Sequence, residues 1–244
     1  DCGGVREQGM LSHILPCHRS VEKAKHREEM EDIWKIPHGS ISEKPGPHTV
    51  NMFDMLGDSI KLIWIVCSNP AQTMPNLKRF FPKMEKAFVI VQDIFSPTQV
   101  QKDKLAHVTA EFADIFLPSA FWIEKGGVFG NTERRSSLTE KILDPPHGLK
   151  ADWEIFKEVA TRMGYGQYYE HYTDTEVIWN EYREASKGTD LDLFGASYSY
   201  LRKTGSVQWP ILSETEGDTP KRYQYPEDKY LKHLVDSGQI TVPE

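Results

Sequence analysis

Residues 62–76 read LIWIVCSNPAQTMPN, an apolar run that changes abruptly into a polar turn. The first five residues are aliphatic or aromatic and rich in β-branched side chains, which predicts a strand covered on both faces. Ser68, Asn69 and Pro70 end the run, Pro75 suits a first helical turn, and residues 76–85 contain enough helix formers to continue it. We therefore expect a strand, a turn and a helix, in that order.

A second apolar run at residues 87–91 follows at the distance that a crossover helix allows, and it ends in Gln92 and Asp93. The two runs and the helix between them make a βαβ unit with parallel strands. Residues 113–118, ADIFLP, predict a third short buried strand. Helices are expected at residues 26–35, 48–56, 152–163, 173–185, 198–203 and 230–235. The fold class is α/β, a Rossmann-like parallel sheet flanked by helices, with an irregular helical C-terminal extension.

Polar side chains follow the first two expected strands where each strand ends. In a βαβ unit the carboxyl ends of the strands form the ligand crevice, so Ser68, Asn69, Gln92 and Asp93 should converge there. Asp93 stands where an acid can accept hydrogen bonds from a ribose or a base. The turn lacks the GxGxxG fingerprint, which argues against NAD and leaves another dinucleotide open. The alternative is an ordinary strand-turn-helix corner with no ligand.

The composition excludes several classes of protein. The chain of 244 residues has a net charge of -7, which argues against a nucleic-acid partner because such a protein must neutralise phosphates. No apolar run approaches the roughly 20 residues that a membrane helix needs.

The cysteines are too scattered for a CxxC motif and the histidines lack HExxH spacing, so we assign no metal site. We expect Cys67 to be a buried small apolar residue at a strand end.

Residues 121–135, FWIEKGGVFGNTERR, have few regular features but many chemically active side chains. Gly126 and Gly127 allow a tight backbone turn, which would present Lys125 at the crevice as a phosphate or base contact. The alternative is a solvated lysine. Asp152 opens the helix expected at residues 152–163, where it is either a helix N-cap or a ligand.

Near the start of the chain, CGGVREQG places Arg6 and Glu7 beside glycines. A fixed guanidinium presents a planar fork of donors that suits an oxyanion. The alternative is a surface ion pair between Arg6 and Glu7.

Several motifs occur in a fixed order along the chain: CGGVREQGMLSH, KHREEMEDIW, CSNPAQTMPN, VIVQD, ADIFLPSAFWIEKGGVFGNTERR and VIWNEYREASKGTDLDLFGASY. With them the chain resembles the large subunit of molybdopterin-dependent oxidoreductases. More narrowly it is similar to the monomeric periplasmic-type nitrate reductases, from residue 2 to about residue 223. It resembles the molybdenum formate dehydrogenases less closely, through VIVQDIF, DW and ATRMGY.

The resemblance implies a second nucleotide-binding half that holds one guanosine end of a bis(molybdopterin guanine dinucleotide) cofactor with molybdenum. The residues that it assigns to cofactor contacts are Asn69, Gln92, Asp93, Lys125 and Asp152. It places Arg6 and Glu7 near the molybdenum, where they would orient the substrate, and it assigns no metal ligand to this chain.

The resemblance also predicts how the chain is organised. Residues 1–60 would be the N-terminal loop and helical part of the cofactor domain, residues 61–165 its Rossmann-like core, and residues 166–244 a helical and irregular extension. The link between VQD and ADIFLP is stretched at residues 99–108. The family's iron-sulfur cysteines, molybdenum-ligand segment and C-terminal capping domain are missing, so we expect a fragment or subunit that is inactive alone. Its partners would be the remaining domains or a complementary subunit.

The function expected from the resemblance is reduction of nitrate to nitrite, with electrons from an electron-donor protein and an iron-sulfur cluster in the missing part. The compartment would be the periplasm by resemblance, or the cytoplasm if the enzyme is assimilatory. One alternative is a formate dehydrogenase or another molybdopterin oxidoreductase. The other is a non-catalytic binding or assembly module that retains only the fold.

Overall fold

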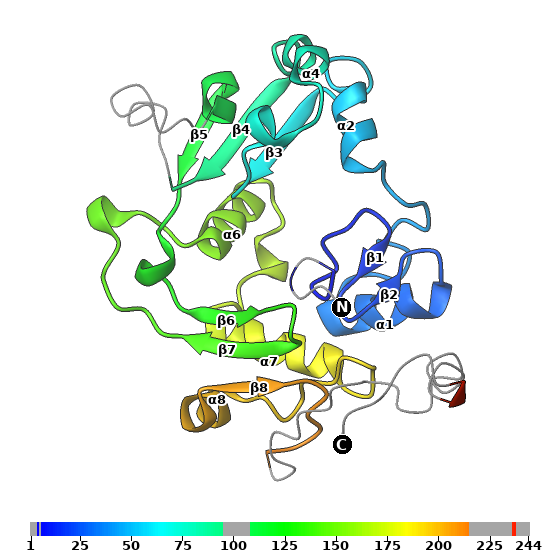
Figure 1. Cartoon of the computed structure of the whole chain (residues 1–244), viewed down its shortest axis with the longest axis vertical. Coiled ribbons are helices and arrows are strands. Elements are labelled where there is room, and N and C mark those ends of the chain that lie inside the picture. The colour runs from blue at the N-terminus through cyan, green and yellow to red at the C-terminus, as the bar shows by residue number, and fades with distance from the viewer. Residues whose placement is uncertain (1–3, 5, 95–107, 215–235, 238–244) are drawn as a thin grey trace.

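A parallel sheet of three strands forms one end of the molecule, in the order β3-β4-β5 (Figure 1). The strands are β3 (Leu62–Val66), β4 (Phe88–Asp93) and β5 (Ile115–Pro118). The computed structural model describes residue 4 and residues 6–94, 108–214 and 236–237. The predicted parallel pairing is confirmed, and so is the α/β fold class. The stretched link at residues 99–108, apart from its last residue, and the helix expected at 230–235 lie outside the described residues.

The connection from β3 to β4 contains two helices, α3 (Pro70–Thr73) and α4 (Leu77–Met84). Pro70 rather than Pro75 stands in a first helical turn, so that detail of the prediction was wrong. Asn76 adopts a left-handed conformation, with φ of 55°, and separates the two helices. The proline ring fixes φ near the helical value and lacks the amide that a first turn leaves unpaired, so Pro70 suits its position.

The core around this sheet is formed by one face of β3 and β4. Ile63 and Ile65 are buried, and Val89 and Val91 are fully buried. They pack with apolar side chains of α4 and of α2 (Thr49–Met55). The expected burial of β3 on both faces and of β5 was wrong. Leu62 is 52% exposed and no residue of β5 is buried, because the edges of this small sheet are only partly covered.

A second sheet is antiparallel and joins distant parts of the chain. It contains β6 (Gly127–Gly130), β7 (Arg135–Thr139) and β8 (Ser206–Gln208), in that order. The prediction that residues 121–135 are largely irregular was therefore wrong. The short strands carry Gly and polar residues in place of an apolar alternation, and their pairing depends on β8, about 70 residues later in the chain.

The second hydrophobic core brings the N-terminal and C-terminal parts together. The hairpin of β1 (Ile14–Leu15) and β2 (Arg19–Ser20) lies near α1 (Ala24–Trp34), and all three are drawn in blue in Figure 1. They pack against α7 (Thr175–Ser186) and residues up to Ile211. The division of the chain at residues 60 and 165 stays a prediction.

The remaining helices agree closely with the sequence. They are α6 (Asp152–Arg162), α7 and α8 (Tyr198–Thr204), with short 3-10 turns η1 (Val108–Phe112), η2 (Trp122–Glu124), η3 (Pro146–Gly148) and η4 (Gly166–Tyr168). Helix α6 lies beyond the carboxyl ends of the parallel strands (Figure 1). Within the part of the chain that is described, no helix is both long and apolar enough to cross a membrane.

Candidate functional site

The carboxyl ends of the parallel strands meet the start of α6. Val66 pairs with Gln92 and Asp93 pairs with Pro118, so the ends of β3, β4 and β5 lie side by side. After β5, Ala120 N donates to Lys150 O at 2.8 Å. That bond joins the chain just after β5 to the chain just before α6. It places Asp152 at the edge formed by the carboxyl ends of the three parallel strands, which we call the strand-end edge.

Three of the predicted cofactor residues join in one cluster there. Asp152 Oδ1 accepts a hydrogen bond from Gln92 Nε2 at 2.8 Å, and Asp152 Oδ2 forms an ion pair with Lys125 Nζ. The side chains of Lys125 and Asp152 are 19% and 22% exposed, whereas Gln92 is fully buried. Gln92 therefore holds the Asp152 carboxylate by a hydrogen bond from the buried side, whereas Lys125 and Asp152 reach the surface.

The ionisation of Asp152 is set by these neighbours. Burial opposes its charge, but the hydrogen bonds from Lys125 and Gln92 outweigh burial and hold the pKa of the carboxyl below its ordinary value. Asp152 is also the first residue of α6, where the helix dipole favours a negative charge. The residue at the N-cap position is Ala151, so the N-cap interpretation of Asp152 was wrong.

Cys67 belongs to the same cluster, contrary to the expectation that it is buried. The residue is exposed, and its Sγ donates to Asp152 Oδ1 at 3.7 Å. Partial burial of the sulfur, and then the neighbouring Asp152 carboxylate, raise the pKa of Cys67 to about 11. The thiol is consequently protonated at neutral pH and acts as a weak donor.

The two remaining predicted cofactor residues lie at the same edge with other partners. Asn69 Oδ1 accepts from Thr109 N at 3.2 Å and from Thr109 Oγ1 at 2.7 Å. Asp93 is 9% exposed, and its Oδ1 accepts from Ile94 N at 2.7 Å. Asn69 thus ties the turn after β3 to η1, and Asp93 shapes the chain that leaves β4.

Lys125 reaches the cluster for a reason other than the expected tight turn. Neither Gly126 nor Gly127 has a positive φ, and Gly127 is already the first residue of β6. A side chain at Gly126 would bring a Cβ within 3.3 Å of Thr139 O, so this glycine permits close packing of the hairpin. The prediction of a Gly-Gly turn was wrong, although Lys125 does lie at the strand-end edge.

A groove with a volume of about 530 Å³ adjoins Lys125 and the start of α6. Its walls also include Glu124, Trp153 and Asp174. Ligand sites in proteins have volumes of this order and combine apolar walls with a few polar groups. The groove is therefore large enough for a nucleoside beside the cluster.

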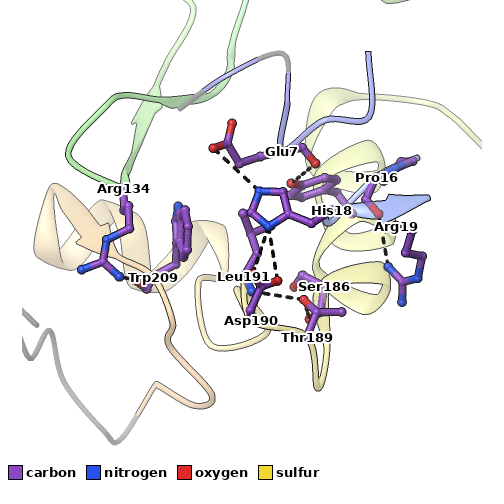
Figure 2. Close-up of polar contacts among 11 residues, drawn as sticks. Glu7, Pro16, His18, Arg19, Arg134, Ser186, Thr189, Asp190, Leu191 and Trp209 are labelled. Carbon is purple, nitrogen blue, oxygen red and sulfur yellow. Dashed lines mark hydrogen bonds and ion pairs between the residues drawn. The ribbon is translucent and has the colours of Figure 1, made fainter. Parts of the chain in front are cut away.

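A second polar cluster surrounds the other predicted pair. Glu7 is buried, whereas Arg6 is exposed, and no ion pair between them occurs among the described residues. The surface ion pair weighed as an alternative was therefore wrong. The imidazole of His18 lies beside Glu7, with Nε2 4.0 Å from Glu7 Oε1, and His18 Nδ1 lies 3.0 Å from Asp190 Oδ2 (Figure 2).

His18 and Asp190 were not predicted from the sequence. They are 172 positions apart, and no spacing motif connects them. The one local signal is the run LPCHR, in which Cys17 and His18 both have a positive φ, of 58° and 60°. The part of the chain that the structure describes contains no group of three or more His, Cys, Asp or Glu side chains placed to bind a metal ion.

Comparison with known proteins gives concordant matches. The family model of molybdopterin oxidoreductases matches residues 5–162. A nitrate reductase of Symbiobacterium thermophilum is 39% identical over 232 residues, which are 94% of this chain and 29% of that protein. A periplasmic nitrate reductase of Desulfovibrio desulfuricans is 41% identical over 225 residues, 91% of this chain and 29% of that protein. The chain thus spans less than a third of these relatives.

Among solved structures, acetylene hydratase from Pelobacter acetylenicus is similar with a TM-score of 0.52. The alignment covers 85% of this chain and 25% of that one, at 15% identity. At this identity the likeness shows the fold alone.

Proposed function

We propose that this chain, which belongs to the molybdopterin oxidoreductase family, holds one guanosine end of a bis(molybdopterin guanine dinucleotide) cofactor in a nitrate reductase. The relatives at 39% and 41% identity are nitrate reductases, which supports nitrate as the substrate and nitrite as the product. A formate dehydrogenase is the second candidate within the family, and a non-catalytic module is the candidate outside it.

The observation that carries the cofactor role is the cluster of Gln92, Lys125 and Asp152 at the strand-end edge. A guanosine presents several N–H and O–H donors, and the Asp152 carboxylate retains lone pairs beyond its present bonds. Among the described residues, Gln92 Oε1 is a buried acceptor that has no hydrogen-bond partner, and a bound donor would satisfy it. Lys125 supplies a positive charge for the anionic part of a nucleotide. The residues present therefore fit this group.

Each of the five proposed cofactor residues has a defined task. Lys125 and Asp152 would contact the nucleotide, and Gln92 would hold Asp152 in position. Asn69 and Asp93 would line the same edge from the ends of β3 and β4. When bound, the cofactor supplies the two-electron oxygen-atom transfer chemistry.

The proposed task of Arg6 is to bind the anionic substrate. Its guanidinium is exposed and offers a planar fork of donors to nitrate. Glu7, the next residue in the chain, is buried and would assist Arg6 in orienting the substrate. The remaining domains, an iron-sulfur cluster and an electron-donor protein would complete the enzyme, in the periplasm or, if assimilatory, in the cytoplasm.

The test uses the full-length protein. Its molybdenum, pterin and guanine contents are measured, followed by turnover with nitrate and with formate. We expect molybdenum and guanine to be retained, with nitrate reduction and no formate oxidation. Formate oxidation without nitrate reduction would establish the second candidate. Absence of both cofactor and turnover would favour the non-catalytic module.

A further inference from the structure

Glu7 is a buried carboxyl group that lacks ordinary partners. Its side chain is 5% exposed, and neither carboxylate oxygen has a hydrogen bond in the described structure. A buried carboxylate without donors is costly, so such a group is retained only where it has a task or a proton. His18 lies beside it, with Nε2 4.0 Å from Glu7 Oε1, and Nε2 also lacks a hydrogen-bond partner in the described structure.

The contact on the other side of the His18 ring determines which ring nitrogen carries the proton when the ring is neutral. Nδ1 lies 3.0 Å from Asp190 Oδ2 and 3.3 Å from Oδ1 (Figure 2). An ionised carboxylate only accepts, so Nδ1 carries a proton and donates to Asp190. In the neutral ring, Nε2 is then an acceptor directed at Glu7. One further proton can sit on Oε1 of Glu7 or on Nε2 of His18, because these two atoms face each other.

The distances allow that exchange after a small movement. Nε2 and Glu7 Oε1 are 4.0 Å apart, about 1 Å beyond a hydrogen bond, which a modest side-chain rotation would close. Catalytic hydrogen bonds are often this long before the substrate binds. Trp209 packs edge-on against the His18 ring, with centroids 6.2 Å apart.

The titratable neighbours do not compete for this proton. Burial raises the pKa of the Cys17 thiol to about 11, and burial raises the pKa of Tyr182 far above its usual value. Both groups stay protonated at neutral pH. Arg19 pairs with Glu29 at 3.0 Å. The guanidinium carbon of Arg134 lies over the Trp209 ring, 5.2 Å from the ring centroid. The side chains left to form a relay here are therefore those of Glu7, His18 and Asp190.

The three groups become progressively more buried from Asp190 through His18 to Glu7. The side chain of Asp190 is 35% exposed, that of His18 20%, and that of Glu7 5%. Glu7 lines a small cavity of about 20 Å³ together with Gly4 and Gln8, which is room for one water molecule. Arg6 is the adjacent residue, with its Cα about 3.8 Å from that of Glu7.

We propose that Asp190, His18 and Glu7 form a proton relay from solvent to nitrate held beside Arg6. The inference rests on the proposed function. Reduction of one nitrate breaks one N–O bond and consumes two protons and two electrons, giving nitrite and one water. The electrons come from the electron-donor protein through the cofactor, and the protons come from solvent. His18 protonated on both ring nitrogens passes its Nε2 proton to Glu7 and keeps the Nδ1 proton that it donates to Asp190. Rotation of the ring then lets the vacated nitrogen take a new proton from the solvent side, where Asp190 lies.

The experiment compares variants of the full-length, cofactor-loaded protein. His18→Gln keeps a polar side chain but cannot relay a proton. The matched control is His38→Gln, because His38 also pairs with an aspartate, Asp32, at 2.8 Å, but on the exposed surface of the molecule. Nitrate turnover is normalised to molybdenum and measured in water and in heavy water, with and without added imidazole.

We expect His18→Gln to lower turnover about 10- to 100-fold, with the KM for nitrate and the molybdenum content unchanged, because proton transfer typically contributes such factors. Imidazole should restore part of the activity, and His38→Gln should behave as wild type. Wild-type turnover in His18→Gln, or a loss that imidazole does not relieve, would overturn the relay. If His18→Gln does not fold, Asp190→Asn replaces it and is held to the same turnover criterion.

A second readout does not require nitrate reduction. Infrared difference spectra across a pH titration should contain a carboxyl band that is missing in Glu7→Gln and shifted in His18→Gln. A Glu7 band that titrates identically in wild type and His18→Gln refutes proton sharing. If the wild-type protein does not reduce nitrate, the proposed function fails while this titration still tests the relay.

Discussion

Replacement of Lys125 by methionine tests the cofactor site most directly. Lys125 forms an ion pair with Asp152 at the start of α6, where both side chains are about four-fifths buried. Methionine keeps an unbranched apolar stem and removes the charge. Whether Lys125 contacts the nucleotide or only holds Asp152 in place, its loss leaves the carboxylate without its cation and should weaken binding of the cofactor.

The size of the effect follows from the burial of the pair. A hydrogen bond between charged groups contributes about 1.5–3 kcal/mol. Because each side chain keeps roughly a fifth of its surface in water, screening reduces this contribution to about 1–2 kcal/mol. A tenfold change in an equilibrium constant corresponds to about 1.4 kcal/mol. The affinity for the cofactor should therefore fall about 5- to 30-fold.

The assay is the guanine and molybdenum content of the full-length protein after extended dialysis. The matched control is Lys25→Met, since Lys25 is 85% exposed and its distance to Glu29 across one turn of α1 is 3.9 Å. Exposed pairs contribute about 0–1 kcal/mol, so the control should keep its cofactor. Equal guanine content in the Lys125→Met and Lys25→Met proteins would refute the proposed role of Lys125.

Three further predictions concern the same protein. Asp93→Asn should weaken cofactor retention by about 1–3 kcal/mol because an acceptor is replaced by a mismatched donor; unchanged guanine content would contradict it. Arg6→Lys should reduce nitrate turnover about 10- to 100-fold at constant molybdenum content, since a positioned fork is lost; undiminished turnover would exclude the substrate role. Because the pKa of Asp152 is lowered in the folded protein, its ionised carboxyl stabilises the fold above about pH 4. That contribution is lost as the pH falls through the lowered pKa, so acid should lower the Tm of wild type more steeply than that of Asp152→Asn.

The strand-end edge could be predicted because it depends on local sequence. The apolar runs of β3 and β4, with polar residues directly after them, indicate both the strands and the edge at which Gln92 and Asp93 lie. Parallel pairing then follows from the intervening helices. The contact partners within the edge could not be predicted. Gln92 supports Asp152 across 60 residues, and Asn69 binds Thr109, because tertiary packing selects one orientation of each side chain.

The sequence by itself determined the α/β class, the positions of most helices and, through its ordered motifs, the resemblance to molybdopterin oxidoreductases. Local propensity and hydrophobic pattern suffice for these features. Only the tertiary structure decided the pairing of β7 with β8 and the approach of Asp190 to His18. Both join segments roughly 70 or more residues apart, whose meeting depends on how the whole core is buried. For the same reason Glu7, predicted as a surface residue or a substrate contact, lies inside the protein beside a histidine that no motif indicated.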